Sequence, residues 1–285
     1  MATDPTTGER GAPSGEQAAG ASRRGLLAAA TAAGLAAACS TAGASSRAAS
    51  TARPAAGGAP AATGPSAPTG ATTPPVTFTP VTARAVANGP RDRAQVALTF
   101  HIGPHEAGQD VSLAHQLLDA SARLDAPITV FAVGQWLDAH ADLVPAILGP
   151  GNELDNHTYT HPTLTALPAA RVASEITACR DVLARLAPTQ GRYFRPSGTS
   201  TATPLIIEQA GAAGYPTVVD FDVDPLDYTS PGADAVVSRV RAGARPGSIV
   251  SMHFGYPGTV AAFPRVVANL RTAGLTPVTL DALLS

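Results

Sequence analysis

The chain has 285 residues, with 45% hydrophobic but only 5% aromatic residues and a formal net charge of −2. From residue 95 onward it carries 11 arginines against 17 acidic residues, so an acidic domain follows a leader with an excess of arginine. That balance argues against a nucleic-acid partner, whose phosphates require a basic face. With no run of 18 or more apolar residues, no membrane-spanning helix is expected.

The first 39 residues have the order of an export signal. Arg23 and Arg24 precede a short run of Ala and Leu that ends at Cys39, an arrangement typical of signal sequences. The arginine pair resembles a twin-arginine signal, and the small residues before Cys39 resemble a lipobox, in which the cysteine is lipidated after cleavage. We expect residues 1–39 to direct export with a lipid anchor at Cys39; the alternative is an Ala-rich cytosolic tail with a chance arginine pair.

Residues 40–92 consist mostly of Ala, Thr, Pro, Gly and Ser. Because such a segment buries too little apolar surface to offset its ordering entropy, it is predicted to be a disordered tether. Residues 93–285 are then long enough for one domain with a substantial core. All basic residues are arginine, which indicates a GC-rich bacterial source. The expected location is the cell envelope or the extracellular space.

Short runs rich in Val, Ile and Phe alternate with segments of helical periodicity in the folded part. The alternation favours an α/β fold with parallel strands joined by right-handed crossovers, in a barrel or a doubly wound sheet. Strands are predicted at 96–100, 127–133, 153–156, 193–195, 217–223, 248–253 and 276–280. Helices are predicted at 111–124, 135–148, 166–186 and 204–213.

Polar side chains recur where the predicted strands end. In a parallel sheet each strand delivers its last side chain to the same rim, so we expect these residues to share one site. They are His101, His157, His161, Arg195, Asp224, Asp227 and His253.

Each of these residues also has an ordinary structural interpretation. His157 and His161 are four residues apart, a spacing that lets both imidazoles reach one metal, although most such pairs are surface or loop residues. Arg195 is either an ordinary surface arginine or, because a proline follows it in a tight turn, a residue suited to binding a carboxylate in bidentate fashion. His253 follows an apolar strand and is as well interpreted as a buried histidine with a backbone partner.

The motifs taken together resemble the polysaccharide deacetylase, or NodB-homology, family over residues 94–285. The matching segments are Thr99 to Pro104, His157 to His161, Arg195 to Gly198, Asp224 to Tyr228 and Ser251 to His253. The resemblance implies a distorted barrel of about seven strands, of the (β/α)7 type. It also implies metal-assisted hydrolysis of N- or O-linked acetyl groups on a glycan such as peptidoglycan or a chitin-like oligomer.

The resemblance also implies roles for individual residues. His157 and His161 correspond to ligands of a divalent metal, most simply zinc. Arg195 orients the base, and His253 is the general acid, paired with Asp227. Tyr228 stands in the substrate groove where the family usually has Trp, and the turn that holds Pro196 and Gly198 contributes to substrate binding.

The first motif departs from the family pattern. His101 occupies the position of the base, and Ile102 occupies that of the metal-binding carboxylate. Three outcomes are open. In the first, His101 turns to the metal and forms a three-histidine site, and Glu106, Asp110 or an aspartate of the 220–224 segment is the base. In the second, His101 is itself the base. In the third, turnover is lost and the domain binds glycan without hydrolysing it.

Overall fold

The computed structural model describes residues 78–104, 111–149 and 151–285. The predicted export signal, Cys39 and residues 40–77 of the predicted tether lie outside the described residues. So do Glu106 and Asp110, two of the proposed bases. Within the described ranges, no helix combines the length and the apolar character needed to cross a membrane.

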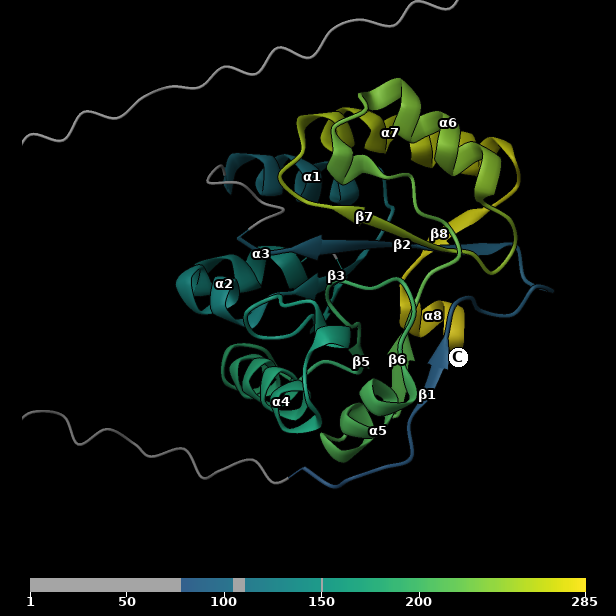
Figure 1. The fold of residues 1–285 in the computed structure, drawn as a ribbon. Coiled ribbons are helices and arrows are strands. Elements are labelled where there is room, and N and C mark those ends of the chain that lie inside the picture. Colours follow the sequence, from purple (N-terminus) through teal and green to yellow (C-terminus); the bar gives the residue numbers. More distant parts are fainter. Residues whose placement is uncertain (1–77, 105–110, 150) are drawn as a thin grey trace, which may run out of the picture. The chain divides into compact units, whose positions relative to one another are not determined.

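An eight-stranded, all-parallel sheet forms the centre of the described domain (Figure 1). The strand order is β1-β6-β5-β4-β3-β2-β7, and β8 pairs with the first half of β2. A single bridge between Val223 and Val250 joins the segment after β6 to β7, so the sheet curls toward closure. The strands are β1 Arg84–Val86, β2 Gln95–Ile102, β3 Thr129–Ala132, β4 Glu153–Asn156, β5 Tyr193–Phe194, β6 Thr217–Val219, β7 Ile249–His253 and β8 Thr276–Val278.

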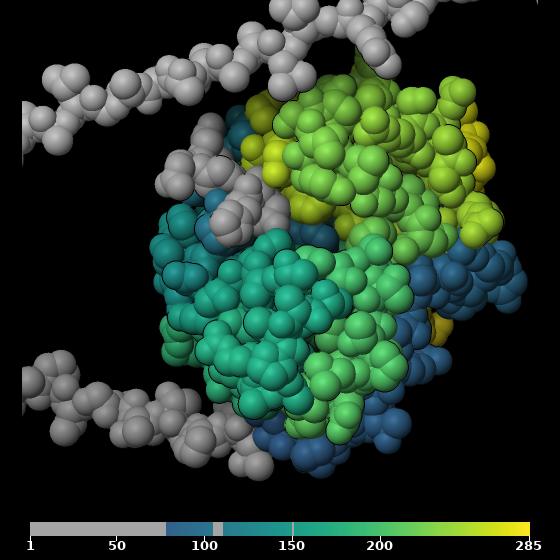
Figure 2. Space-filling model, in the orientation of Figure 1, coloured from purple at the N-terminus to yellow at the C-terminus, as the bar shows by residue number. Residues whose placement is uncertain are grey.

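Helices cover the outside of this curled sheet (Figure 1). Helices α1, α6 and α7 pack together beside β2 and β7, whereas α2, α4 and α5 lie near β3 to β6. In the space-filling view these two groups form separate areas of one face (Figure 2). The helices are α1 Val111–Arg123, α2 Gly134–Ala139, α3 Val144–Leu148, α4 Ala169–Leu186, α5 Pro204–Ala212, α6 Ala233–Gly243, α7 Pro257–Thr272 and α8 Leu280–Leu284.

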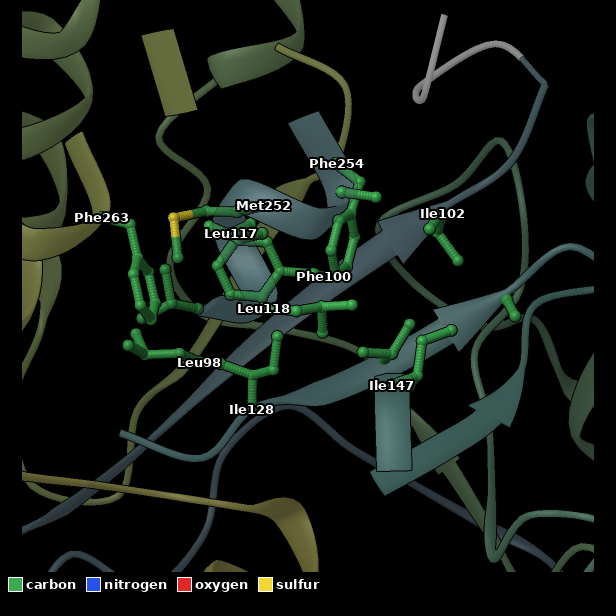
Figure 3. Close-up of a cluster of buried hydrophobic side chains, with 14 of the residues drawn as sticks. Leu98, Phe100, Ile102, Leu117, Leu118, Ile128, Ile147, Met252, Phe254 and Phe263 are labelled. Carbon is green, nitrogen blue, oxygen red and sulfur yellow. The ribbon is translucent and has the colours of Figure 1, made fainter. Parts of the chain in front are cut away.

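Strand β2 separates an apolar layer from the interior of the barrel. Leu98, Phe100 and Ile102 alternate along one face and pack in the main core against side chains of α1 and α7 (Figure 3). Thr99 and His101 occupy the other face, as the two-residue period of a strand requires. The expected α/β barrel-like fold is therefore confirmed, with its polar residues directed inward at the carboxyl end of β2.

Two predictions of the fold were wrong in detail. Strand β1 lies inside the predicted tether, where Arg84–Val86 pairs with β6; an edge strand needs only backbone partners and little apolar surface, so composition gave no sign of it. The predicted helix 135–148 is broken at His140 into α2, a 3₁₀ turn over Ala141–Leu143 and α3. Pro145 explains the break, because proline is accepted in the first turn of a helix but not in its interior.

Candidate active site

A cleft of about 480 Å³ opens where β2 and β7 end. The residues expected at the rim meet there, except that Arg195 and Asp227 lie just beneath the surface of the cleft, 1% exposed. The lining residues are His101, His157, His161, Pro196, Gly198, Thr199, Ser200, Phe221, Asp224, Tyr228, Ser251, His253 and Tyr256.

His157 and His161 lie side by side in the cleft, with ring centroids 4.9 Å apart. Nδ1 of His157 lies 2.9 Å from the carbonyl oxygen of Arg195, so Nδ1 carries the proton and the lone pair is on Nε2. The loop between them is tightly turned, since Thr158 and His161 have positive φ values of 69° and 59°.

Buried Glu175 of α4 holds this loop from below. Its carboxylate accepts hydrogen bonds from the backbone N–H groups of Tyr159 and Thr160, at 3.1 and 2.8 Å, and from the Thr160 hydroxyl at 2.8 Å. The two histidines are thus presented by a loop that Glu175 anchors through the backbone of Tyr159 and Thr160. No pattern in the sequence indicates this role, because an acidic residue within a helix is usually a solvent-exposed one.

Asp227 and His253 form a tight pair beside the cleft. Oδ1 of Asp227 lies 2.8 Å from Nδ1 of His253, and Oδ2 accepts from the backbone N–H of His253 at 2.8 Å and from the Thr259 hydroxyl at 2.7 Å. With four hydrogen bonds in all, counting the backbone N–H of Tyr228 at 3.0 Å, the carboxylate fixes the imidazole ring. Thr259, at the start of α7, is a residue that sequence reasoning missed.

The exposed ring of Tyr228 stands over this pair. It meets the His253 ring edge-on, with centroids 5.2 Å apart, and Tyr256 does the same at 6.2 Å. Tyr228 is 44% exposed, so its face is available to stack on a sugar ring. Tyr256 was not predicted, although its position three residues after His253 places it at the same strand end.

The turn after β5 shapes the opposite wall. Gly198 has φ +67°, and a Cβ atom there would lie 2.7 Å from Cα of Thr163, so this wall requires glycine. Pro196 is buried against the cleft and Gly198 is exposed on it. Both are therefore placed where a substrate would contact them.

Arg195 is a buried cation solvated by neutral groups. It donates to the Thr99 hydroxyl at 2.7 Å, to the Val219 carbonyl at 3.0 Å and to Nε2 of His101 at 3.2 Å. Its guanidinium carbon lies 4.2 Å from the centroid of the Phe131 ring, a cation–π contact. Burial lowers the pKa of Arg195 to about 9, which still leaves it charged at neutral pH.

His101 uses both ring nitrogens in this arrangement. Nε2 faces Arg195, and Nδ1 lies 2.9 Å from Nε2 of His253; the ring also stacks on His157 with centroids 4.1 Å apart. Burial, followed by the neighbouring His157, lowers the pKa of His101 well below its usual value. As a metal ligand or as a base, His101 would need a nitrogen lone pair that is free to bind the metal or a proton. These contacts occupy that lone pair, so neither interpretation fits.

The aspartates of the 220–224 segment separate in space. Asp224 lines the cleft. Asp220 accepts from the backbone of Ala202, and Asp222 forms an ion pair with Arg91 at 2.7 Å. Of the three carboxylates proposed as bases here, Asp224 is therefore the one that faces the cleft.

Comparisons with known proteins identify the family of this chain. A family model described as polysaccharide deacetylase matches residues 88–218. A chitooligosaccharide deacetylase of Rhizobium leguminosarum bv. trifolii is 34% identical over 197 residues, which are 68% of this chain and 84% of the relative. The chain belongs to the polysaccharide deacetylase family. The resemblance drawn from the motifs is confirmed, and the family is one of hydrolases that act on acetyl groups of polysaccharides.

Solved structures agree on the fold. A peptidoglycan N-acetylglucosamine deacetylase is 27% identical with a TM-score of 0.64, covering 70% of this chain and 92% of that one. A family 4 carbohydrate esterase pseudoenzyme from Bacillus anthracis is 21% identical with a TM-score of 0.66, covering 72% of this chain and 70% of that one. At that identity the second likeness concerns the fold alone.

Polysaccharide deacetylases generally depend on a divalent metal, but the described residues of this member do not supply its ligand set. Ile102 has no donor atom and its side chain is fully buried in the core (Figure 3). His101 is engaged on both nitrogens. No group of three or more His, Cys, Asp or Glu side chains within the described ranges is arranged to hold a metal ion. The pair His157 and His161 remains the partial site.

Proposed function

We propose that the protein removes acetyl groups, N- or O-linked, from a cell-wall or extracellular polysaccharide. The observation that carries the proposal is the Asp227–His253 pair, held by Thr259 at the edge of a cleft that Tyr228 overhangs. Relatives named chitooligosaccharide deacetylase and peptidoglycan-N-acetylglucosamine deacetylase support an acetylated amino-sugar chain as substrate.

His253 and Asp227 act on the leaving group in this proposal. Cleavage of an acetamide requires a proton on the departing nitrogen, because an amide anion is too poor a leaving group in water. Asp227 holds Nδ1 of His253, at 2.8 Å, which directs Nε2 away from the carboxylate. A proton on Nε2 is then the one delivered to the amino sugar as its C–N bond breaks.

Water attack needs a proton acceptor at the cleft. His101 does not serve, because its lone pair receives the Arg195 hydrogen bond. We assign this step to Asp224, whose carboxylate belongs to the cleft wall and accepts the backbone N–H of Leu226 at 2.8 Å. Arg195 then holds His101, in contrast to the family pattern in which the arginine orients a carboxylate base.

Metal binding, with zinc as the simplest ion, stays a separate part of the proposal. His157 and His161 are the residues that would hold it. Because the described residues lack a full ligand set, no step of the reaction is assigned to the ion.

A second candidate function follows from Ile102. Its full burial in the apolar core removes the carboxylate that the family places beside the two histidines. A chain changed in this way, with the cleft and Tyr228 retained, is suited to binding a glycan without hydrolysing it. The two functions share a ligand and differ in acetate release.

Export is proposed from the leader. Paired arginines before a short apolar run, followed by Cys39, support a twin-arginine route and a lipid anchor. An exported protein would meet peptidoglycan or chitin-like material outside the cell. Detection of the chain, and of a lipid on Cys39, in membrane fractions of cells expressing the parent but not a Cys39→Ala variant tests this part.

The deciding experiment measures binding and turnover on the same samples. The full chain is incubated with N-acetylated chito-oligosaccharides and with peptidoglycan fragments, and both bound glycan and free acetate are quantified. Acetate release by the parent supports the deacetylase. Binding without acetate, weakened by Tyr228→Ala, supports the glycan-binding candidate. Neither binding nor acetate with any glycan would contradict both.

A further inference from the structure

Four side chains form a continuous line of hydrogen bonds beneath the cleft. Arg195 contacts Nε2 of His101 at 3.2 Å, and Nδ1 of His101 contacts Nε2 of His253 at 2.9 Å. Nδ1 of His253 contacts Oδ1 of Asp227 at 2.8 Å. All four are buried, at 9% exposure or less, so the line is largely shielded from water.

The two ends of the line fix the direction of every bond in it. A guanidinium only donates, so Nε2 of His101 must accept, and the proton of that neutral ring lies on Nδ1. Nδ1 of His101 then donates to Nε2 of His253, which accepts. The proton of His253 therefore lies on Nδ1, where the Asp227 carboxylate accepts it.

Other protonation patterns conflict with the contacts. A proton on Nε2 of His101 would face the N–H of Arg195, and a proton on Nε2 of His253 would face the N–H on Nδ1 of His101. Either arrangement sets two donors against each other at 3.2 or 2.9 Å in a buried site, where an unsatisfied polar group is costly. The line thus fixes which nitrogen of each imidazole donates and which accepts.

We infer that His101 is a positioning residue that keeps His253 in its resting state by donating to Nε2, the nitrogen from which the leaving group must receive its proton. The inference rests on the proposed deacetylation. The contact is built into the sheet, because His101 and His253 are register partners on the adjacent strands β2 and β7. Turnover requires this hydrogen bond to open when the glycan enters the cleft, and Nε2 of His253 then takes up from water the proton that it passes to the leaving nitrogen.

Aspartate and asparagine at position 101 separate this role from a merely structural one. The two side chains have nearly the same shape, but a carboxylate accepts a hydrogen bond where the amide nitrogen donates one. His101→Asp therefore favours a proton on Nε2 of His253, whereas His101→Asn retains a donor facing it.

The test uses the full chain, with ¹⁵N-labelled histidine observed by NMR at neutral pH and acetate release measured in parallel. In the parent and in His101→Asn, Nδ1 of His253 should be protonated and Nε2 should not. In His101→Asp both nitrogens should carry protons, and acetate release should rise by about tenfold or more over His101→Asn.

The outcomes distinguish this inference from the proposed function. A proton on Nε2 of His253 in the parent, or the same His253 signals in the Asp and Asn variants, would overturn the inference. Where acetate is released, equal rates from those two variants would overturn it as well. Absence of acetate from every variant would contradict the deacetylase, while the NMR signals would still decide the direction of the hydrogen bond.

Discussion

His101 and Ile102 are adjacent in the chain but face opposite sides of β2. His101 contacts Arg195 and His253 on the cleft side, and Ile102 is fully buried in the core cluster that also contains Phe254 (Figure 3). The two departures from the family motif therefore have separate consequences. One changes the hydrogen bonding of the site, and the other replaces a metal-binding side chain with part of the apolar core.

Substitution of Ile102 should reveal its place in the core. Ile102→Asp puts a carboxyl group among apolar side chains, so the free energy of unfolding should fall by about 3 kcal/mol or more. Ile102→Val removes one methyl group and should cost about 1 kcal/mol. Urea denaturation of the two variants measures the difference. Equal stability of the two would mean that the side chain at 102 can leave the core for the cleft.

Glu175 should govern the loop that carries His157 and His161. Glu175→Ala removes the acceptor of three hydrogen bonds and should lower the free energy of unfolding by about 1 to 3 kcal/mol. Glu175→Gln keeps a carbonyl for the backbone donors and an amide for the Thr160 hydroxyl, so it should cost less. Chemical denaturation compares them; an alanine variant as stable as the glutamine variant would contradict this role.

Asp155 should make stability depend on pH. Burial raises its pKa to about 8, and Oδ2 has no hydrogen-bond partner within the described part of the chain. Between about pH 4 and pH 8 the folded protein then holds a proton that the unfolded chain has lost, so stability falls as pH rises. The slope approaches about 1.4 kcal/mol per pH unit for one group.

Asp155→Asn is the matched control for that slope. The amide oxygen keeps the bonds from the backbone N–H groups of Arg192 and Tyr193, and the side chain no longer titrates. Glu153 and Asp281 remain in both proteins, so the comparison changes a single carboxyl group. Urea denaturation at pH 5, 6, 7 and 8 should show a shallower decline in the variant. Parallel curves would contradict the raised pKa of Asp155.

Zinc should bind weakly to the two-histidine pair. Two imidazoles alone give fewer ligands than the three protein ligands typical of catalytic zinc, so dialysis against metal-free buffer should strip the ion from the full chain. His157→Ala should abolish the binding that remains. Stoichiometric zinc that survives dialysis, measured by elemental analysis, would show that further ligands complete the site.

The sequence predicted which residues meet at the site but not the hydrogen bonds between them. The two-residue period of β2 and the strand ends brought His101, His157 and His253 to one rim, as expected. The bond between His101 and His253 depends on the register of β2 against β7, strands about 150 residues apart in sequence, which no local pattern encodes.

Turn geometry and edge pairing account for other misses. The loop between His157 and His161 relies on non-glycine residues with positive φ, including Thr158, a conformation that residue type did not indicate. Strand β1 forms through backbone bonds to β6 and has little apolar surface of its own. Local composition therefore placed it in the tether.

Acetate release from N-acetylated chito-oligosaccharides by the full chain, with Asp227→Asn as the paired variant, decides whether the protein is a deacetylase. We expect release by the parent and a loss of about 100-fold or more in Asp227→Asn, because the asparagine cannot hold His253 as the carboxylate does. Equal rates in the two proteins, or no acetate from the parent while the glycan still binds, would contradict this expectation.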